Sequence, residues 1–375
     1  MPSYRRFTKI FFLVLNVTAS VAFLLACLAP YLNPKKWWFI SLIGLGFAFV
    51  IVTLIAFIFF WLVFKARYVP ISIVPMIIGW KSIMVFFAFH TPHKFDYNKK
   101  ANALRIAHWN VARFTEWKRN NNKGSQTRLK MMDQIKAQNA DILCFQEFFS
   151  STDPDYYNNL SYISKELAYP YYFFARDSEG PRQWGGQVIF SRLPILDSGM
   201  IRFPKPSMPE TLVHVDVALQ GDTIRVYTTH LQSVQFRRKE FEEIESIKNT
   251  DDGIVENSKN IFSKLKRGVV LRCSQADLVK KEISSSPHPF VLTGDFNDVP
   301  NSYTYFTIRG EDLKDAFLQT GLGVGKTFSY IAPTLRIDYM FTTPQLEVKQ
   351  FNRIIKNYSD HYMLVADLMV GGKGY

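Results

Sequence analysis

The stretch Phe-Val-Leu-Thr-Gly-Asp-Phe-Asn, residues 290–297, indicates the fold class most directly. Apolar and β-branched residues lead to Gly294, and the polar side chains of Asp295 and Asn297 follow where a strand would end. Such a run predicts a buried strand. Because burying polar groups without partners costs several kcal/mol each, polar residues at its end indicate a shared site that gives them partners.

Further apolar runs follow one another after residue 103, and we predict strands at 104–111, 142–147, 171–176, 187–192, 212–219, 223–231, 290–297, 336–341 and 362–370. Helical patterns lie near 125–139, 155–168, 238–247 and 257–283. Many strands with a few interspersed helices favour an α/β or α+β fold of layered sheets with helices outside. The polar residues that close or adjoin the strands are Asn110, Glu147, His230, Asp338, Asp360 and His361.

The first hundred residues have a different composition. They carry eleven Lys and Arg and a single acid, Asp96, so they hold +10 of the net charge of +13. Two long uncharged apolar runs predict transmembrane helices near 10–30 and 38–63, since a bilayer core needs about 20 apolar residues per helix. We expect residues 1–92 to form a membrane anchor, 93–103 a linker and 104–375 the catalytic domain.

A third apolar run, residues 68–90, contains Lys81, Pro70 and Pro75, so it either spans the bilayer or lies in its interface. With three spans the catalytic domain faces outward, and with two it faces the cytoplasm. Arg5, Arg6 and Lys9 favour a cytoplasmic N-terminus, whereas the basic pair at 35–36 opposes it weakly. We expect a multi-pass protein of a bacterial inner membrane.

Oxygen ligands without a cysteine cluster suit a hard cation, Mg²⁺ or Mn²⁺. Glu147 is the best first ligand, and Asn110 and Asp295 add neutral and anionic oxygens. Protonated His230 and His361 would donate to phosphoryl oxygens as charge develops. The residue types therefore favour metal-assisted hydrolysis of a phosphate ester.

Seven short motifs occur in one order along the chain and resemble those of the endonuclease/exonuclease/phosphatase superfamily. They are Trp109-Asn110, Gln146-Glu147, Gly185-Gly186 with Ile189-Phe190-Ser191-Arg192, Thr229-His230-Leu231, Gly294-Asp295-Phe296-Asn297, Arg336-Ile337-Asp338-Tyr339 and Ser359-Asp360-His361. The resemblance covers residues 104–370. It implies a four-layer α/β sandwich with two packed, mainly antiparallel sheets.

The resemblance also implies roles for the motif residues. Glu147 would be the main Mg²⁺ ligand, with Asn110 and Asp360 near the metal, and Asn297 would position the attacking water that Asp295 orients or deprotonates. His230 would contact the phosphate, and His361 would act on the phosphoryl group, oriented by Asp338. Whether Asp295 or His361 is the general base stays open at this stage.

The substrate follows less directly, because one fold serves many substrates. The predicted anchor and the small charge of +3 on residues 101–375 favour a phospholipid or lipid-linked phosphodiester beside the bilayer. A membrane-tethered nuclease is the alternative, with a basic stretch at Arg113, Lys118, Arg119, Lys123 and Arg128 to grip phosphates. A non-catalytic membrane scaffold is a third interpretation. No protein partner is inferable.

Overall fold

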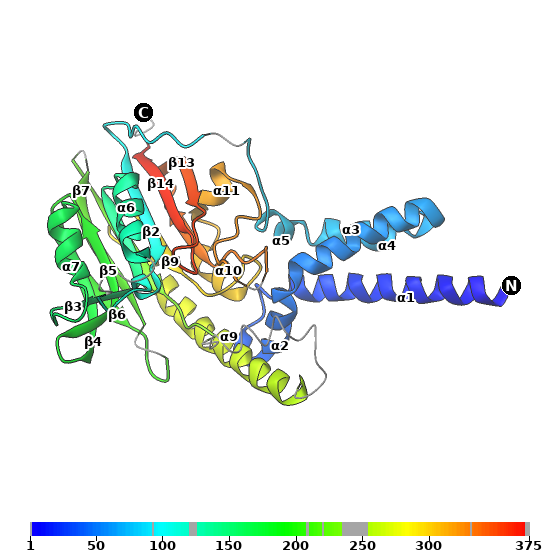
Figure 1. Cartoon of the computed structure of the whole chain (residues 1–375). Helices are drawn as coiled ribbons and strands as arrows, with labels where there is room; N and C mark the ends of the chain where they lie inside the picture. The colour runs from blue at the N-terminus through cyan, green and yellow to red at the C-terminus, as the bar shows by residue number, and fades with distance from the viewer. Residues whose placement is uncertain are drawn as a thin grey trace.

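The structure is a computed structural model of the whole chain. It describes residues 2–91, 94–119, 126–207, 210–219, 221–234, 254–330 and 332–371. A domain of two packed β-sheets forms one end of the molecule, and long helices from the N-terminal segment project from it (Figure 1).

The two large sheets have six strands each. One sheet has the order β13-β14-β2-β3-β5-β4, and the other has the order β10-β12-β9-β8-β7-β6. The strands are β2 Leu104–Asn110, β3 Ile142–Ser151, β4 Tyr171–Gly180, β5 Gln183–Ser191, β6 Ile195–Arg202, β7 Thr211–Leu219, β8 Asp222–His230, β9 Phe290–Asp295, β10 Lys314–Asp315, β12 Asp338–Thr342, β13 Leu346–Ile354 and β14 Met363–Val370.

Strand direction within each sheet is mainly antiparallel, as expected. In the first sheet only β2 and β3 run parallel, and in the second only β8 and β9 do. The carboxyl end of β2 lies beside Gln146 of β3, which continues to Ser151, and the carboxyl ends of β8 and β9 lie side by side. This arrangement brings the polar residues at the strand ends to one place.

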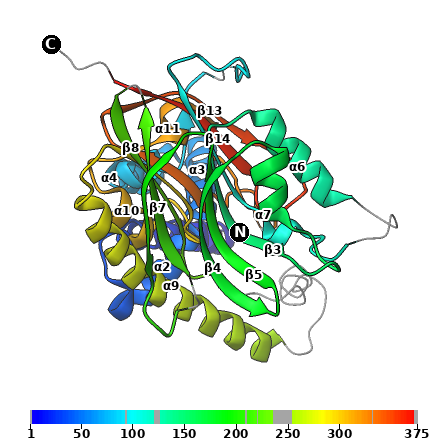
Figure 2. The ribbon, with the colours of Figure 1, turned by 90° about the vertical axis from the view of Figure 1, so that its left-hand side faces the viewer.

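The helices of the domain cover the outer faces of the sheets. Valines and isoleucines of both sheets form the inner core. Figure 2 shows α6 and α7 on one side of the paired sheets and α9 and α10 on the other, so the four-layer α/β sandwich is confirmed. These helices are α6 Thr127–Gln138, α7 Asn159–Ser161 with a π-helical turn at Tyr162–Glu166, α9 Ile254–Ser284, α10 Tyr303–Arg309 and α11 Ala316–Thr320.

Several elements differ from the sequence expectation. The edge strands β6 and β13 and the short helices α10 and α11 were not predicted. The predicted helix at 155–168 is reduced to α7 and the π-helical turn, and the one at 238–247 lies outside the described residues. β6 is mostly exposed, so it lacks the alternating apolar pattern that reveals a half-buried strand.

The N-terminal segment consists of α1 Pro2–Cys27, α2 Pro34–Leu45, α3 Phe47–Phe64, α4 Pro70–Ile78 and α5 Trp80–Met84, with a 3-10 turn at Ala66–Tyr68. Within the described residues, two helical segments are long and apolar enough to cross a membrane, Arg6–Cys27 and Phe47–Phe64. The second predicted span, 38–63, is therefore divided at Gly46 between α2 and α3. The third run forms two short helices that meet at Gly79.

The helices of this segment pack as an antiparallel bundle. Phe12 contacts Phe60 and Phe23 stacks on Phe47, so α3 runs antiparallel to α1. A hydrogen bond of 2.8 Å joins Ser72 Oγ to Asn16 Oδ1 and fixes α4 beside the middle of α1. The turn between α3 and α4 thus lies toward the N-terminal end of α1, away from the catalytic domain (Figure 1).

The bundle is attached to the two-sheet domain by buried hydrogen bonds. Asn301 Nδ2 donates to the carbonyl of Ala26 at 2.9 Å, and Arg336 Nη2 donates to the carbonyl of Val85 at 2.6 Å. A short pairing of β1 Ala88–Phe89 with β11 Leu322–Gly323 adds a second connection. The end of α1 is therefore held against the loop that follows β9.

The predicted linker also packs against the domain where the structure describes it. Phe95 is buried against the first sheet, and Arg105 lies over its ring at 4.9 Å. Gln350 on β13 accepts a hydrogen bond from the Asp96 amide and donates one to the Asp96 carbonyl, both at 2.9 Å. Residues 94–97 are thus fixed to the sheet.

Candidate active site

The parallel pairings of β2 with β3 and of β8 with β9 end at one place between the sheets. Asn110 ends β2, Glu147 lies in β3, and His230 and Asp295 end β8 and β9. The Asn110 amide nitrogen donates to Asp295 Oδ2 at 3.0 Å and to Glu147 Oε1 at 3.2 Å. One buried amide therefore links residues from both sheets.

Glu147 reaches this point because of an irregularity in β3. The pairing of β3 with β5 shifts register between Phe145 and Phe148, which is a β-bulge, and Glu147 has φ +48°. A bulge redirects a side chain that the strand would otherwise place on a packed face. The Glu147 side chain is 42% exposed, in contrast to its buried neighbours, so it is open to a ligand from solvent.

The turn after β9 is fixed by close packing. A Cβ atom at Gly294 would lie 2.6 Å from the Thr229 carbonyl oxygen, so only glycine allows β9 to approach β8 here. Asp295 Oδ1 accepts from the Asn297 amide at 2.9 Å, and Asn297 Nδ2 donates to the Leu231 carbonyl at 3.0 Å. Asp295 and Asn297 are therefore both held in place.

A buried carboxylate between two histidines forms the other half of the site. Asp338 Oδ2 lies 2.9 Å from His361 Nδ1, and Asp338 Oδ1 lies 3.2 Å from His108 Nε2. The other ring nitrogen of His361, Nε2, faces Asp295 Oδ2 at 3.5 Å. The indole nitrogen of Trp109 donates to the His361 carbonyl at 2.8 Å. His361 is thus oriented through its ring and its backbone.

The electrostatics of this half are strong because the groups are buried. Burial lowers the pKa of His361, but the charges of Asp338 and Asp295 outweigh it and hold that pKa well above its ordinary value. Burial raises the pKa of Asp338, yet the charge of His361 and the hydrogen bonds from both histidines hold it well below its ordinary value. Burial raises the pKa of Asp295.

His230 is buried with an unsatisfied ring nitrogen. Its Nε2 lies 3.6 Å from Asp295 Oδ2 and 4.0 Å from Glu147 Oε1, and it has no hydrogen-bond partner among the described residues. Burial lowers the pKa of His230, but the charges of Glu210 and Asp295 raise it above its ordinary value. A buried donor of this kind is expected to meet a ligand.

The residues present fit a hard cation at the open side of the site. Glu147 and Asp360 are close enough for the Glu147 charge to raise the pKa of Asp360, although burial of Asp360 raises that pKa more. Ligand atoms of Asp295, Asp338 and His361 also lie within 4.8 Å of one another. Both Asp338 oxygens already contact histidines, so Glu147, Asp360 and Asn110 offer the freer oxygen atoms.

All eight residues expected from the sequence therefore lie around one site, and three further residues support it, of which His108 and Glu210 were not predicted. His108 looks like a core residue within β2 and gives no sequence signal. Glu210 is buried beside His230 and accepts from Gln275 Nε2 at 3.3 Å. The Thr327 hydroxyl accepts from the amides of Ile337 and Asp338 at 2.9 and 3.1 Å, so it fixes the start of β12.

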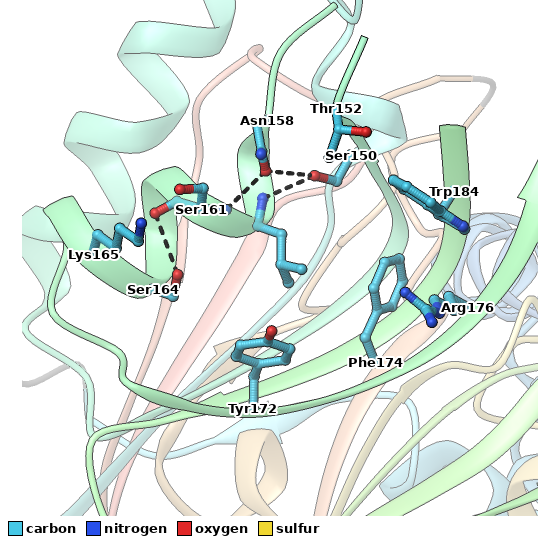
Figure 3. Close-up of a pocket in the computed structure, with 11 residues that line it drawn as sticks. Ser150, Thr152, Asn158, Ser161, Ser164, Lys165, Tyr172, Phe174, Arg176 and Trp184 are labelled. Atoms are coloured by element: carbon cyan, nitrogen blue, oxygen red, sulfur yellow. Dashed lines mark hydrogen bonds between the residues drawn. The ribbon is translucent and has the colours of Figure 1, made fainter. Parts of the chain in front are cut away.

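A separate cavity of about 270 Å³ lies on the outer face of the first sheet and shares no residue with this site. Figure 3 shows Tyr172, Phe174 and Trp184 lining one part of it. The amide of Leu160 donates to Ser150 Oγ at 3.0 Å, and Ser150 Oγ lies 3.3 Å from Asn158 Oδ1. These polar groups hold the start of α7 against the sheet.

Comparison with known proteins agrees with this geometry. Residues 107–361 match the model of the endonuclease/exonuclease/phosphatase family, and residues 8–86 match a model described as a domain of unknown function. No protein with a curated description matches the chain in sequence.

Among solved structures, the chain resembles an endonuclease/exonuclease/phosphatase from Beutenbergia cavernae, with 21% identity, a TM-score of 0.51 and 72% of each chain covered. It also resembles the human nocturnin catalytic domain (17% identity, TM-score 0.49, covering 72% of this chain and 94% of that chain). A D. rerio TDP2 humanized by 14 mutations gives 18% identity, a TM-score of 0.48, and 72% and 99% coverage. The family match spans more than half of the chain and contains the whole site, so the chain belongs to the endonuclease/exonuclease/phosphatase family of metal-dependent hydrolases of phosphoester bonds.

Proposed function

We propose that this protein is a membrane-anchored, Mg²⁺-dependent phosphodiesterase that acts on a phospholipid or lipid-linked phosphodiester. One observation carries the proposal. The loop that bears Asp295 and Asn297 continues to Asn301, whose buried amide donates to the carbonyl of Ala26 at the end of α1. The catalytic loop is thus attached directly to a helix long and apolar enough to cross a membrane.

The contacts of the site support a division of labour among its residues. His361 and His230 donate to phosphoryl oxygens, because each presents a ring nitrogen toward the space beside Asp295. Asp295 takes the proton of the attacking water, and Asn297 positions that water. Asp338 acts as a positioning residue, because both of its oxygens are occupied by histidines.

The proposed ion is Mg²⁺, with Mn²⁺ as a substitute. Glu147 would hold it, assisted by Asp360 and the Asn110 side chain, because this ion prefers oxygen ligands and needs only one or two carboxylates. When bound, the ion supplies charge neutralisation at the phosphate and at the leaving oxygen.

The contacts of the basic stretch at residues 113–128 favour a lipid substrate over nucleic acid. Arg113 pairs with Glu179 through both guanidinium nitrogens, and Arg128 is buried with its Nε donating to Asn159 Oδ1 at 2.6 Å. Lys123 lies outside the described residues. Arginines already paired with protein groups are poorly placed to neutralise phosphates along a nucleic acid.

The arrangement of charges also suggests an orientation in the membrane. Lys9, Lys65 and Arg67 lie toward the free end of the bundle, and Arg5 and Arg6 belong to the same end of α1. Basic residues in short segments favour the cytoplasmic side. The catalytic domain, at the other end, would then face outward, and residues 66–87 would return across the bilayer.

The test uses the full-length protein in liposomes and in detergent. Mg²⁺-dependent release of head group or phosphate is measured on a lipid panel, with plasmid DNA for comparison and Glu147→Gln as the inactive control. Lipid turnover that is lost in Glu147→Gln supports the proposal. DNA cleavage without lipid turnover would establish the nuclease instead. If Glu147→Gln and His361→Ala left every assayed activity unchanged, the scaffold interpretation would replace both.

A further inference from the structure

The surface formed by α2 and residues 259–267 of α9 combines aromatic and basic side chains. Trp37 and Phe39 of α2 are 39% and 41% exposed, and Phe262 of α9 is 48% exposed. Trp38 joins the two helices, since its ring centroid lies 5.2 Å from that of Phe262 and Lys266 Nζ lies 4.7 Å from its centroid. We call this surface the aromatic ledge: Trp37, Trp38, Phe39 and Phe262, with Lys35, Lys36, Lys259, Lys266 and Arg267.

The charge of the ledge is of one sign. α2 contains two lysines and no acid, and residues 257–268 of α9 contain Lys259, Lys264, Lys266 and Arg267 and no acid. Exposed tryptophan and phenylalanine beside lysine and arginine is the composition of surfaces that lie in the interface of an anionic bilayer.

The position of the ledge agrees with this composition. Figure 1 shows α2 and the beginning of α9 at the base of the projecting helices α1, α3 and α4, the level at which a bilayer around those helices would end. α2 is held there, because a Cβ on Gly44 would lie 3.2 Å from the Asn301 carbonyl oxygen and 3.0 Å from Ala29 Cβ. The ledge is therefore fixed in place relative to the proposed spans.

The same helix connects the ledge to the active site. Arg272 Nη1 donates to the Gln232 carbonyl at 3.0 Å, and the Gln232 amide donates to Gln275 Oε1 at 2.8 Å. Gln232 follows His230 by two residues. Arg267 and Arg272 are separated by about 7.5 Å along the helix axis, at 1.5 Å per residue. The ledge and the segment that follows His230 are thus joined through one helix.

We propose that the aromatic ledge is a docking surface for the head groups of an anionic bilayer, which brings the active site to the membrane surface. This inference rests on the proposed function only in taking α1 and α3 to lie in a membrane. It adds a second membrane contact, which α9 of the catalytic domain makes together with α2 of the N-terminal segment.

Depth-dependent quenching tests the proposal in the full chain. A fluorophore is attached to Phe262→Cys in a Cys27→Ser background, because Cys144 and Cys273 are buried. The protein is reconstituted in phosphatidylcholine vesicles that contain either no phosphatidylglycerol or about 30% of it. An anionic lipid fraction of this size gives the vesicle a clear negative surface potential. Brominated acyl chains should quench this label, more strongly with the anionic lipid. A label at Leu196→Cys, on β6 away from the projecting helices (Figure 1), should stay unquenched.

Charge reversal gives the matched comparison. Lys259→Glu/Arg267→Glu changes the ledge, and Lys280→Glu/Lys281→Glu makes the same charge change at the other end of α9. Each basic residue near an anionic surface favours the docked form roughly fivefold. Because it removes two basic residues, Lys259→Glu/Arg267→Glu should lower the ratio of docked to undocked protein by at least about 25-fold. Lys280→Glu/Lys281→Glu should leave this ratio unchanged.

Two further measurements keep the result interpretable. Amide hydrogen exchange of residues 259–267 in the unsubstituted protein should slow when anionic lipid replaces zwitterionic lipid. Equal quenching at positions 262 and 196, with unchanged exchange, would overturn the ledge. Hydrolysis of bis(p-nitrophenyl) phosphate with Mg²⁺ reports the proposed function separately, so a docked but inactive protein and an active but undocked one are distinguished.

Discussion

The two sheets contribute to the active site in the same way but in different environments. Each places the end of its one parallel pairing at the site, with Asn110 and Glu147 from the first sheet and His230 and Asp295 from the second. On the first sheet, a bulge leaves the Glu147 side chain 42% exposed. On the second, Asp295 and Asp338 are almost completely buried.

This difference separates two tasks. An exposed carboxylate can exchange ligands with solvent, as metal binding requires. Buried groups keep shifted pKa values and fixed geometry, as stabilisation of developing charge requires. We therefore infer that the exposed Glu147 recruits the ion. The buried groups, which are Asp295 and Asp338 of the second sheet and His361 just before β14, are suited to proton transfer and phosphate stabilisation. The predictions below test this separation.

Removal of the buried imidazole should have the largest effect. In His361→Ala the donor facing the phosphate is lost, and kcat for a soluble phosphodiester should fall by roughly 10²–10⁴-fold. Affinity for Mn²⁺, measured by titration calorimetry, should change little because the oxygen ligands remain. A large loss of Mn²⁺ affinity in this variant would show that the two tasks are not separate.

Asp338→Asn should reduce kcat less, because the imidazole of His361 remains. The carboxylate charge that holds the pKa of His361 above its ordinary value is removed, so that pKa falls. If protonated His361 is needed, activity is lost as pH rises through this pKa. The alkaline limb of the pH–kcat profile should therefore move to lower pH. An unchanged profile would mean that another group produces that limb.

Glu147→Gln tests the exposed side. The amide keeps the shape of the side chain but removes its charge, so the dissociation constant for Mn²⁺ should rise by at least about 10–100-fold. The activity that remains should increase with metal concentration, which is not expected for His361→Ala. Asp153→Asn removes a carboxylate from the turn after β3 outside the site and serves as the charge control.

The sequence predicted the fold class, and the eight candidate site residues that it indicated lie together in the structure, because local patterns carry both signals. Apolar runs identify buried strands such as β9, and polar residues at their ends identify the site. Strands at the sheet edges are less visible, because β6 and β13 bury few side chains and alternate weakly. The bulge at Glu147 is also invisible in sequence, since it depends on pairing with β5.

The supporting residues were missed for a related reason. His108 lies in the middle of a buried strand and resembles a core residue until Asp338 is placed beside it. The hydrogen bond from Asn301 to the Ala26 carbonyl joins residues 275 positions apart, and no local sequence pattern predicts it. Long-range contacts of single polar groups therefore form the part of the site that sequence patterns do not reveal.

Thr327 supports the start of β12, and its substitution should have the smallest effect of the substitutions proposed. Thr327→Val keeps the shape but removes the oxygen that accepts from the amides of Ile337 and Asp338. Leaving buried amides unsatisfied costs about 1–3 kcal/mol, which should appear as a lower Tm in detergent. Because Asp338 orients His361, kcat should also fall a few-fold, roughly as expected for 1 kcal/mol of misplacement. Thr327→Ser, which retains the hydroxyl, should restore both. A lower Tm with unchanged kcat would limit Thr327 to stabilising the fold.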